Sequence, residues 1–109
     1  KKILKAFINS NHKSIDVESI QNLVASYFNL NLQEMLSPRR SWVLARPRQI
    51  AMYLAKKMTT RSLPEIGRRF ANRDHTTVIH AVKTITKLSQ ENEEMNKNIN
   101  QITNLLLKE

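Results

Sequence analysis

Apolar residues recur every three or four positions along much of this 109-residue chain, which is the spacing of one face of an α-helix. In the first clear example, over residues 17–28, the shared face is formed by Ile20, by Val24 or Leu23, and by Tyr27. Asp16 stands directly before this stretch, where an aspartate can accept hydrogen bonds from the free N–H groups of a first helical turn. We therefore predict a helix over 17–28 that Asp16 caps.

Residues 29–58 predict a helical turn, a loop and a longer helix. Residues 29–36 predict a short helical turn whose inward-facing side chains are Leu32, Met35 and Leu36. The next five residues, Ser37–Ser41, are too polar and too basic for a core, so we expect an exposed basic loop. Pro47 suits the first turn of a helix, where its missing N–H is not needed. The helix has an apolar stripe formed by Ile50, Tyr53, Leu54 and Met58, which predicts that it ends near Met58.

The pattern of residues 62–91 predicts a short helix, a tight turn and a long helix. Ser62 and Glu65 have the spacing of a capping box, with Pro64 in the first turn, so a short helix should cover 63–70. Residues 71–73 form the turn, in which Asn72 is the expected left-handed residue, and Asp74 should cap the helix that follows. The packed face of that long helix carries Val78, Ile79, Val82, Ile85 and Leu88, and its other faces carry His75, Thr76, Thr77, His80 and Lys83.

The two ends of the chain have different predicted roles. A last segment over 90–107 is amphipathic through Met95, Ile99, Ile102 and Leu106, and its acidic residues lie at its N-terminal end, which suits the helix dipole. Residues 1–7 have the pattern of a helix tail that enters from upstream. We therefore divide the chain into a connector helix over 1–12 and a helical domain over 13–109.

Composition favours an all-α fold and excludes several functional classes. The chain has one glycine and three prolines, which is little material for hairpin turns or for a glycine-rich phosphate loop. It has no cysteine, so disulfides, thiolate zinc sites and cysteine nucleophiles are excluded. No apolar run approaches the ~20 residues of a membrane-spanning helix, and the lack of a charged and apolar leader pattern argues against secretion of this segment. We expect a small cytoplasmic domain.

The net charge of +9 is concentrated in one block. Residues 39–73 contain all eight arginines and two lysines against the single acid Glu65, whereas the other residues carry eight bases and eight acids. Lysine and arginine neutralise phosphates and release condensed counterions, and arginine also forks onto guanine edges. A diffuse excess would suggest only a solvated surface. The segregated block indicates a polyanion partner.

Two helices joined by a short turn, the second opening with small polar side chains, form a helix-turn-helix. In this arrangement the first turn of the second helix comes closest to base edges in the major groove. Thr76 and Thr77 can hydrogen-bond to bases and offer methyl groups to thymine, Asp74 can accept from a cytosine amino group, and His75 can donate. Structural roles are the alternatives: a helix cap for Asp74 and β-branched filler for the threonines. His80 is more often packed or solvated, so we do not include it.

Residues 73–81 (RDHTTVIHA) resemble the signature of the DnaA family. The resemblance continues through 45–52 (ARPRQIAM) and 62–67 (SLPEIG), and it covers most of the chain from Asp16 to Lys87. It implies a Trp-repressor-like helix-turn-helix domain, monomeric when isolated, that binds the asymmetric, A·T-leaning box of the bacterial replication origin. It also implies an upstream nucleotide-binding motor outside this chain, with ATP as its cofactor, a nucleoid location, and an association with acidic phospholipids.

The same resemblance assigns roles to single residues. The major-groove residues are Asp74, His75, Thr76 and Thr77, and Arg40 enters the adjacent minor groove, where the negative potential of narrow A·T sequence favours arginine. Along the phosphate backbone and groove wall we expect Arg39, Arg48, Gln49, Lys56, Leu63, Pro64 and Arg73. The chain departs from the family pattern at Pro38 and Trp42 in the loop, and Ala71-Asn72 stands where the turn usually contains glycine.

Three alternative functions can be distinguished from this one. An enzyme is disfavoured because His75 and His80 are five residues apart and do not share a helical face, and no metal or phosphate motif is present. We therefore expect neither a catalytic residue nor a metal. A membrane-surface protein would use the basic residues on anionic lipid, but residues 1–13 lack an aromatic face. A helix-turn-helix transcriptional regulator would dimerise on a palindrome.

Overall fold

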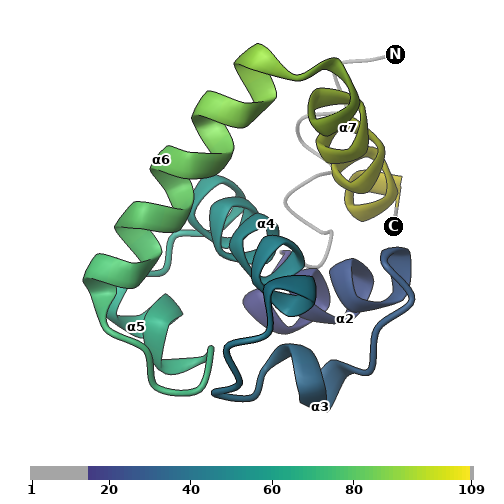
Figure 1. Ribbon diagram of the computed structural model, residues 1–109. Helices are drawn as coiled ribbons and strands as arrows, with labels where there is room; N and C mark the ends of the chain where they lie inside the picture. Colours follow the sequence, from purple (N-terminus) through teal and green to yellow (C-terminus); the bar gives the residue numbers. More distant parts are fainter. Residues whose placement is uncertain (1–14, 109) are drawn as a thin grey trace, which may run out of the picture.

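The computed structural model describes residues 15–108, which form helices joined by short connections and contain no strand (Figure 1). In chain order the helices are α2 (Val17–Tyr27), α3 (Leu32–Met35), α4 (Trp42–Met58), α5 (Leu63–Arg68), α6 (His75–Glu91) and α7 (Glu93–Lys108). The predicted all-α class is confirmed, with the helix-turn-helix formed by α5 and α6. The predicted connector over 1–12 lies outside the described residues.

The first helix begins as predicted, whereas the second begins at Leu32 and is shorter than the turn predicted over 29–36. Asp16 is the N-cap of α2, and its Oδ1 accepts from the Ser19 amide at 2.9 Å. This bond lowers the pKa of the Asp16 carboxyl below its ordinary value of 3.8. Asn31 caps α3 in the same way, through the Gln33 and Glu34 amides. Within the predicted faces, fully buried side chains include Ile20, Val24 and Met35.

α4 begins at Trp42, five residues before the predicted start at Pro47. Ser41 is its N-cap, and the Ser41 Oγ accepts from the Val43 amide at 3.3 Å. Pro47 therefore lies inside the helix, where it has no N–H for the carbonyl of Val43. The predicted loop over 37–41 is confirmed, but the predicted helix start was wrong, because Ser41 caps the helix and the buried Leu44 already belongs to its first turn.

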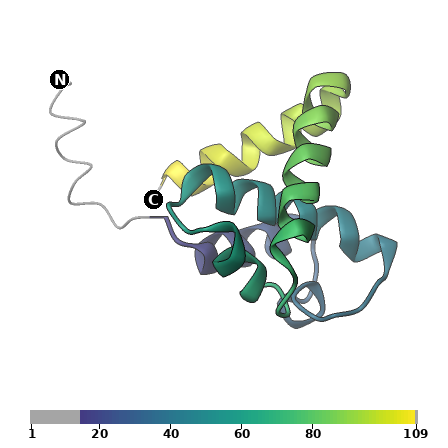
Figure 2. The ribbon, with the colours of Figure 1, turned by 90° about the vertical axis from the view of Figure 1, so that its left-hand side faces the viewer.

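The core forms where α6 crosses α4, with α2 and α5 packed around the crossing (Figures 1 and 2). Every helix contributes apolar side chains to it, including Ile20, Met35, Leu54, Ile66, Ile85 and Ile102. Phe70, in the turn after α5, is also fully buried. This packing holds the short helix α5 and the turn that follows it against α4 and α6.

α7 is a separate helix that returns from the end of α6 toward α2 (Figure 1). The start of the predicted helix over 90–107 was wrong, because α6 continues to Glu91 and the helix is interrupted at Asn92 before α7 begins. The Asn92 Oδ1 accepts from the Met95 amide at 2.9 Å, so asparagine caps the new helix. The Tyr27 hydroxyl on α2 contacts Asn98 and Gln101 on α7 through hydrogen bonds. The predicted apolar face is confirmed by Ile99, Ile102 and Leu106, which are buried.

Candidate nucleic-acid interface

The start of α5 and the turn that follows position the long helix α6. The Ser62 Oγ accepts from the Glu65 amide at 3.3 Å, which is one half of the predicted capping box. The Glu65 carboxylate instead forms ion pairs at 3.4 Å with Arg61 and Arg69. The buried Gln21 on α2 donates from Nε2 to the Arg69 carbonyl at 2.8 Å and so ties the end of α5 to the core. Gln21 could not be identified from the sequence, because a single polar residue on an apolar face has no distinctive pattern.

The turn contains two consecutive left-handed residues. Ala71 has a φ of 61° and Asn72 a φ of 57°. The prediction of Asn72 is confirmed, but Ala71 takes the same conformation, which alanine rarely adopts because its Cβ approaches the following carbonyl. The two residues reverse the chain so that the Arg73 amide can donate to the Gly67 carbonyl at 2.8 Å. The reversal places the first turn of α6 at the surface.

The first turn of α6 presents four exposed polar side chains, as predicted: Asp74, His75, Thr76 and Thr77. Asp74 occupies the N-cap position, but its carboxylate makes no hydrogen bond to the helix backbone, so the predicted capping bond is absent. The carboxylate accepts from the Thr76 hydroxyl at 3.0 Å and lies 3.1 Å from the His75 Nδ1. The Thr76 hydrogen bond lowers the pKa of the Asp74 carboxyl. The carboxylate therefore stays ionised at neutral pH and orients its neighbours.

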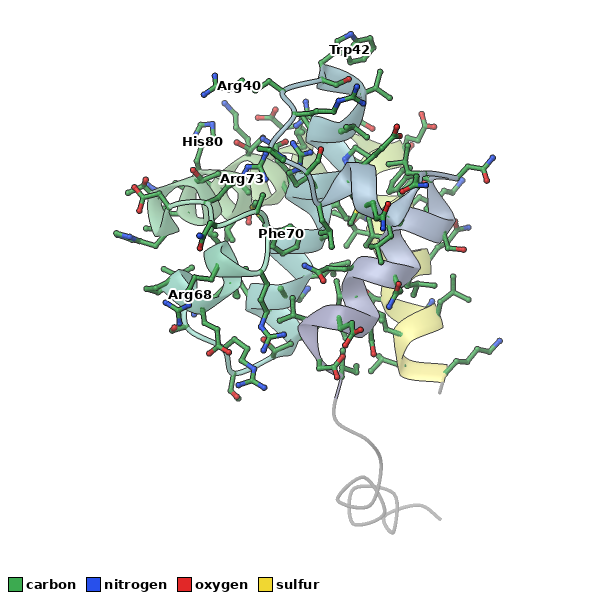
Figure 3. The ribbon with its side chains drawn as sticks, turned by 90° about the horizontal axis from the view of Figure 1, so that it is seen from below. Arg40, Trp42, Arg68, Phe70, Arg73 and His80 are labelled. Carbon is green, nitrogen blue, oxygen red and sulfur yellow. The ribbon has the colours of Figure 1, made fainter. Side chains whose placement is uncertain are left out.

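His80 extends the exposed surface of α6 by one turn. It lies four residues after Thr76 and three after Thr77, which places all three on adjoining positions of one helical face. Figure 3 shows His80 projecting from α6 on the same side of the molecule as Arg40. His80 was not among the predicted site residues, because its spacing in the sequence does not distinguish a solvated histidine from one beside the groove-facing turn.

The basic loop between α3 and α4 presents both predicted arginines. Arg39 and Arg40 are exposed, and Arg39 forms a solvent-exposed ion pair with Glu34 at 3.6 Å. Arg40 projects away from the fold, and Trp42 projects beyond it from the start of α4 (Figure 3). Trp42 is 85% exposed. The loop thus offers unburied cationic and aromatic side chains.

Arg48 lies inside the protein, although the family resemblance assigned it to the phosphate backbone. Only 6% of the residue is exposed, and its guanidinium donates to carbonyl oxygens of the preceding helix and loop. The acceptors are the carbonyls of Met35 at 2.8 Å, Arg39 at 3.0 Å, Ser37 at 3.1 Å and Glu34 at 3.4 Å. Burial, together with the charge of Arg73, lowers the pKa of Arg48 to about 10, so it remains charged at neutral pH. This placement does not match the expected surface role.

Arg73, another expected phosphate contact, is also partly engaged within the protein. Its guanidinium donates to the Phe70 carbonyl at 2.9 Å and to the Ser37 carbonyl at 3.2 Å. Partial burial, with a contribution from the charge of Arg40, lowers the pKa of Arg73. Figure 3 shows Arg73 on the same side of the molecule as Arg40 and His80. Arg73 therefore connects the turn before α6 with the basic loop.

The remaining expected backbone contacts lie on α4 and at the start of α5. Lys56 and Pro64 are exposed, and Leu63 is half-buried. Gln49 is half-buried and accepts from Arg46 at 2.8 Å through its Oε1. Their contacts with phosphate stay predictions.

Two other kinds of feature are absent from the part of the chain that the structure describes. Over residues 15–108, no group of three or more His, Asp or Glu side chains is arranged to hold a metal ion. The helices of the same residues include none that is both long and apolar enough to cross a membrane.

Comparisons with known proteins agree with this arrangement. The family described as bacterial dnaA protein helix-turn-helix matches residues 17–85, from the start of α2 into α6. The chromosomal replication initiator protein DnaA of Ehrlichia ruminantium (strain Gardel) is 52% identical over 104 residues, which cover 95% of this chain and 22% of that protein.

Proteins of the same name from two other bacteria are similar to the chain. That of Gluconobacter oxydans is 52% identical over 86 residues, or 79% of this chain and 18% of the relative. That of Brucella abortus is 55% identical over 95 residues, which cover 81% of this chain and 19% of the relative. The chain thus spans about a fifth of the length of these relatives. The match over α2 to α6, together with these identities, shows that the chain belongs to the DnaA helix-turn-helix family.

Proposed function

We propose that this domain binds duplex DNA sequence-specifically at the box of a bacterial replication origin and so takes part in initiating chromosome replication. The first turn of α6 enters the major groove, and Arg40 enters the adjacent minor groove. One observation carries this proposal: Arg73, which directly precedes the four exposed polar residues at the start of α6, donates to the Ser37 carbonyl of the loop that carries the exposed Arg40. Phosphate contacts alone would not need such an arrangement, since they carry no sequence information.

The electrostatics favour the same partner. The basic excess lies between residues 39 and 73, which include the loop, α4, α5 and the turn before α6. A duplex placed across the loop and the first turn of α6 would meet the exposed charges of Arg39 and Arg40. The relatives carry the name chromosomal replication initiator protein DnaA. We extend that role to this domain within a longer protein, with an ATP-binding motor domain and acidic phospholipids as expected partners of the whole.

A binding titration tests the proposal. Fluorescein-labelled duplexes, one with an asymmetric origin box and one with the same bases scrambled, are titrated with the chain while fluorescence anisotropy is followed. We expect the box to bind more tightly by a factor of about 10³ or more at physiological salt, without added nucleotide. Sedimentation of the complex should give one chain per box. A requirement for a palindrome and a dimer would indicate a transcriptional regulator instead, and equal affinity for both duplexes would refute sequence-specific binding.

A further inference from the structure

The carbonyl oxygen of Ser37 accepts hydrogen bonds from two arginines that come from different parts of the fold. Arg48 reaches it from α4 at 3.1 Å, and Arg73 reaches it from the turn before α6 at 3.2 Å. Arg73 lies 36 residues after Ser37 in the chain. One oxygen of the basic loop is therefore the meeting point of the loop, α4 and the helix-turn-helix.

Two arginines that donate to one carbonyl are unfavourably placed for surface charges but well placed to hold the loop against α4 and the turn. The pair Arg48 and Arg73 at the Ser37 carbonyl is called the clamp below. Two guanidiniums close together repel each other, and partial burial disfavours the charge of both, so phosphate binding alone would not require them to be placed here. Hydrogen bonds from charged donors to carbonyls offset this cost, because they are stronger than neutral ones. Arginine provides five N–H groups in a rigid fork, whereas lysine provides a single ammonium. Only the fork can hold the four carbonyls that Arg48 holds.

We propose that Arg48 and Arg73 are positioning residues that set the distance between the two DNA-reading elements through the Ser37 carbonyl. Arg40 directly follows Arg39, whose carbonyl accepts from Arg48 at 3.0 Å, and Asp74 directly follows Arg73. Each reading element is thus one residue from the clamp. The domain then recognises both base sequence and the number of base pairs between the minor-groove and major-groove parts of the box. This inference rests on the proposed function.

Charge-conserving variants separate a clamp from a phosphate contact. Arg48→Lys keeps the positive charge but loses the fork, so a phosphate contact would survive while the clamp would not. We expect box affinity to fall by about tenfold or more while scrambled DNA binds nearly as before. Arg73→Lys should act in the same direction. Arg61→Lys is the matched control, because Arg61 is exposed and pairs only with Glu65, and it should leave both affinities unchanged.

Two further readouts test the positioning role itself. Boxes with one base pair inserted between the minor-groove and major-groove parts should bind poorly to the unmodified chain, and the penalty should shrink in Arg48→Lys. In a double-mutant cycle, Arg40→Ala should cost clearly less in the Arg48→Lys background than in the unmodified chain, because an unheld loop no longer places Arg40. Backbone ¹⁵N relaxation of the free protein should show lower order parameters at residues 38–40 in the variant.

The outcomes distinguish this inference from the function on which it rests. If the unmodified chain does not prefer the box, both fail. If it prefers the box but Arg48→Lys binds like the unmodified chain, or the cost of Arg40→Ala is the same in both backgrounds, only the clamp is overturned. Thermal unfolding followed by circular dichroism controls for the fold. If both lysine variants unfold at room temperature, the two arginines serve the fold rather than the interface, and the inference is likewise overturned.

Discussion

Gly67 and Arg73 approach each other backbone to backbone across the turn of the helix-turn-helix. The Arg73 amide donates to the Gly67 carbonyl at 2.8 Å, and a Cβ added to Gly67 would lie 2.3 Å from the Arg73 carbonyl oxygen. A side chain of any size therefore requires the backbone of the turn to move. The only glycine of the chain stands where the start of the recognition helix is set.

The first prediction is that Gly67→Ala destabilises the domain. The added methyl group would force Arg73 away and strain the bond that closes the turn, so the free energy of unfolding should fall by about 3 kcal/mol. Urea denaturation followed by circular dichroism measures this change. Ser26→Ala on the exposed face of α2 serves as the control and should alter stability by less than about 0.5 kcal/mol. A fall of similar size in both variants would contradict a specific close approach.

The second prediction is that Ala71→Gly stabilises the domain. Ala71 has a φ of 61°, where alanine carries a steric cost that glycine does not have, and this gain exceeds the extra flexibility of glycine in the unfolded chain. We expect a gain of about 0.5–1 kcal/mol in the free energy of unfolding. Ala45→Gly, the same substitution inside α4, should instead cost about 1 kcal/mol. If both variants lose stability, Ala71 is not strained.

The turn and Arg48 show which features were predictable from sequence. The spacing of apolar residues located most of the helices, and Asp16 and Ser62 marked helix starts because their side chains accept amide hydrogen bonds there. Asn72 could be assigned a left-handed conformation from its residue type, but Ala71 carries no such signal, because only the path of the chain imposes its φ. Likewise, an arginine such as Arg48 is expected at the surface from its residue type, because its burial depends on carbonyls more than eight residues away in the chain.

The boundary of α4 and the role of Asp74 were missed for related reasons. Pro47 favours a helix start, but tertiary packing of Leu44 extended the helix beyond it toward the loop. Asp74 has the residue type and position of a cap, yet its carboxylate bonds to the Thr76 side chain. In both cases a local preference competed with a partner that sequence spacing does not specify.

The third prediction concerns pH and the cap of α2. The hydrogen bond from the Ser19 amide lowers the pKa of the Asp16 carboxyl below 3.8, so the ionised cap contributes stability above pH 3.8. That contribution should disappear as pH falls through the lower pKa of the folded state. Asp16→Ala should therefore cost about 1 kcal/mol at pH 7, and the difference from the unmodified chain should shrink between about pH 4 and pH 2. Denaturant unfolding at a series of pH values measures it. A difference that is constant down to pH 2 would show that the charge of Asp16 does not matter.

The fourth prediction tests Thr76 as a reader of the major groove. Thr76→Ala removes a methyl group and the hydroxyl that donates to Asp74, and it should weaken binding to the box by about 1–3 kcal/mol with little change on scrambled DNA. Thr76→Ser keeps the hydroxyl and loses only the methyl group, so the difference between Thr76→Ser and the unmodified chain isolates the methyl contact, and the difference between the two variants isolates the hydroxyl. Anisotropy titrations provide both affinities. An equal loss on box and scrambled duplexes would return Thr76 to a purely structural role.

The last prediction separates the two neighbouring arginines of the basic loop. Arg39→Ala and Arg40→Ala each remove one exposed positive charge, so they form a matched pair. If Arg39 contacts phosphate, its loss should weaken binding to box and scrambled DNA alike and should flatten the dependence of log Kd on log salt by about one counterion.

Arg40 should behave differently if it enters the minor groove. Arg40→Ala should weaken binding mainly to the box and only slightly to scrambled DNA. Replacing the A·T pairs of the minor-groove part by G·C should weaken binding of the unmodified chain by a similar factor, because the guanine amino group blocks the groove floor. The two changes should not add, since either one removes the same contact. Affinities measured by anisotropy over a range of salt concentrations give all of these quantities. Additive losses, or an Arg40→Ala effect of equal size on scrambled DNA, would make Arg40 one more phosphate contact and leave α6 as the reader of the sequence.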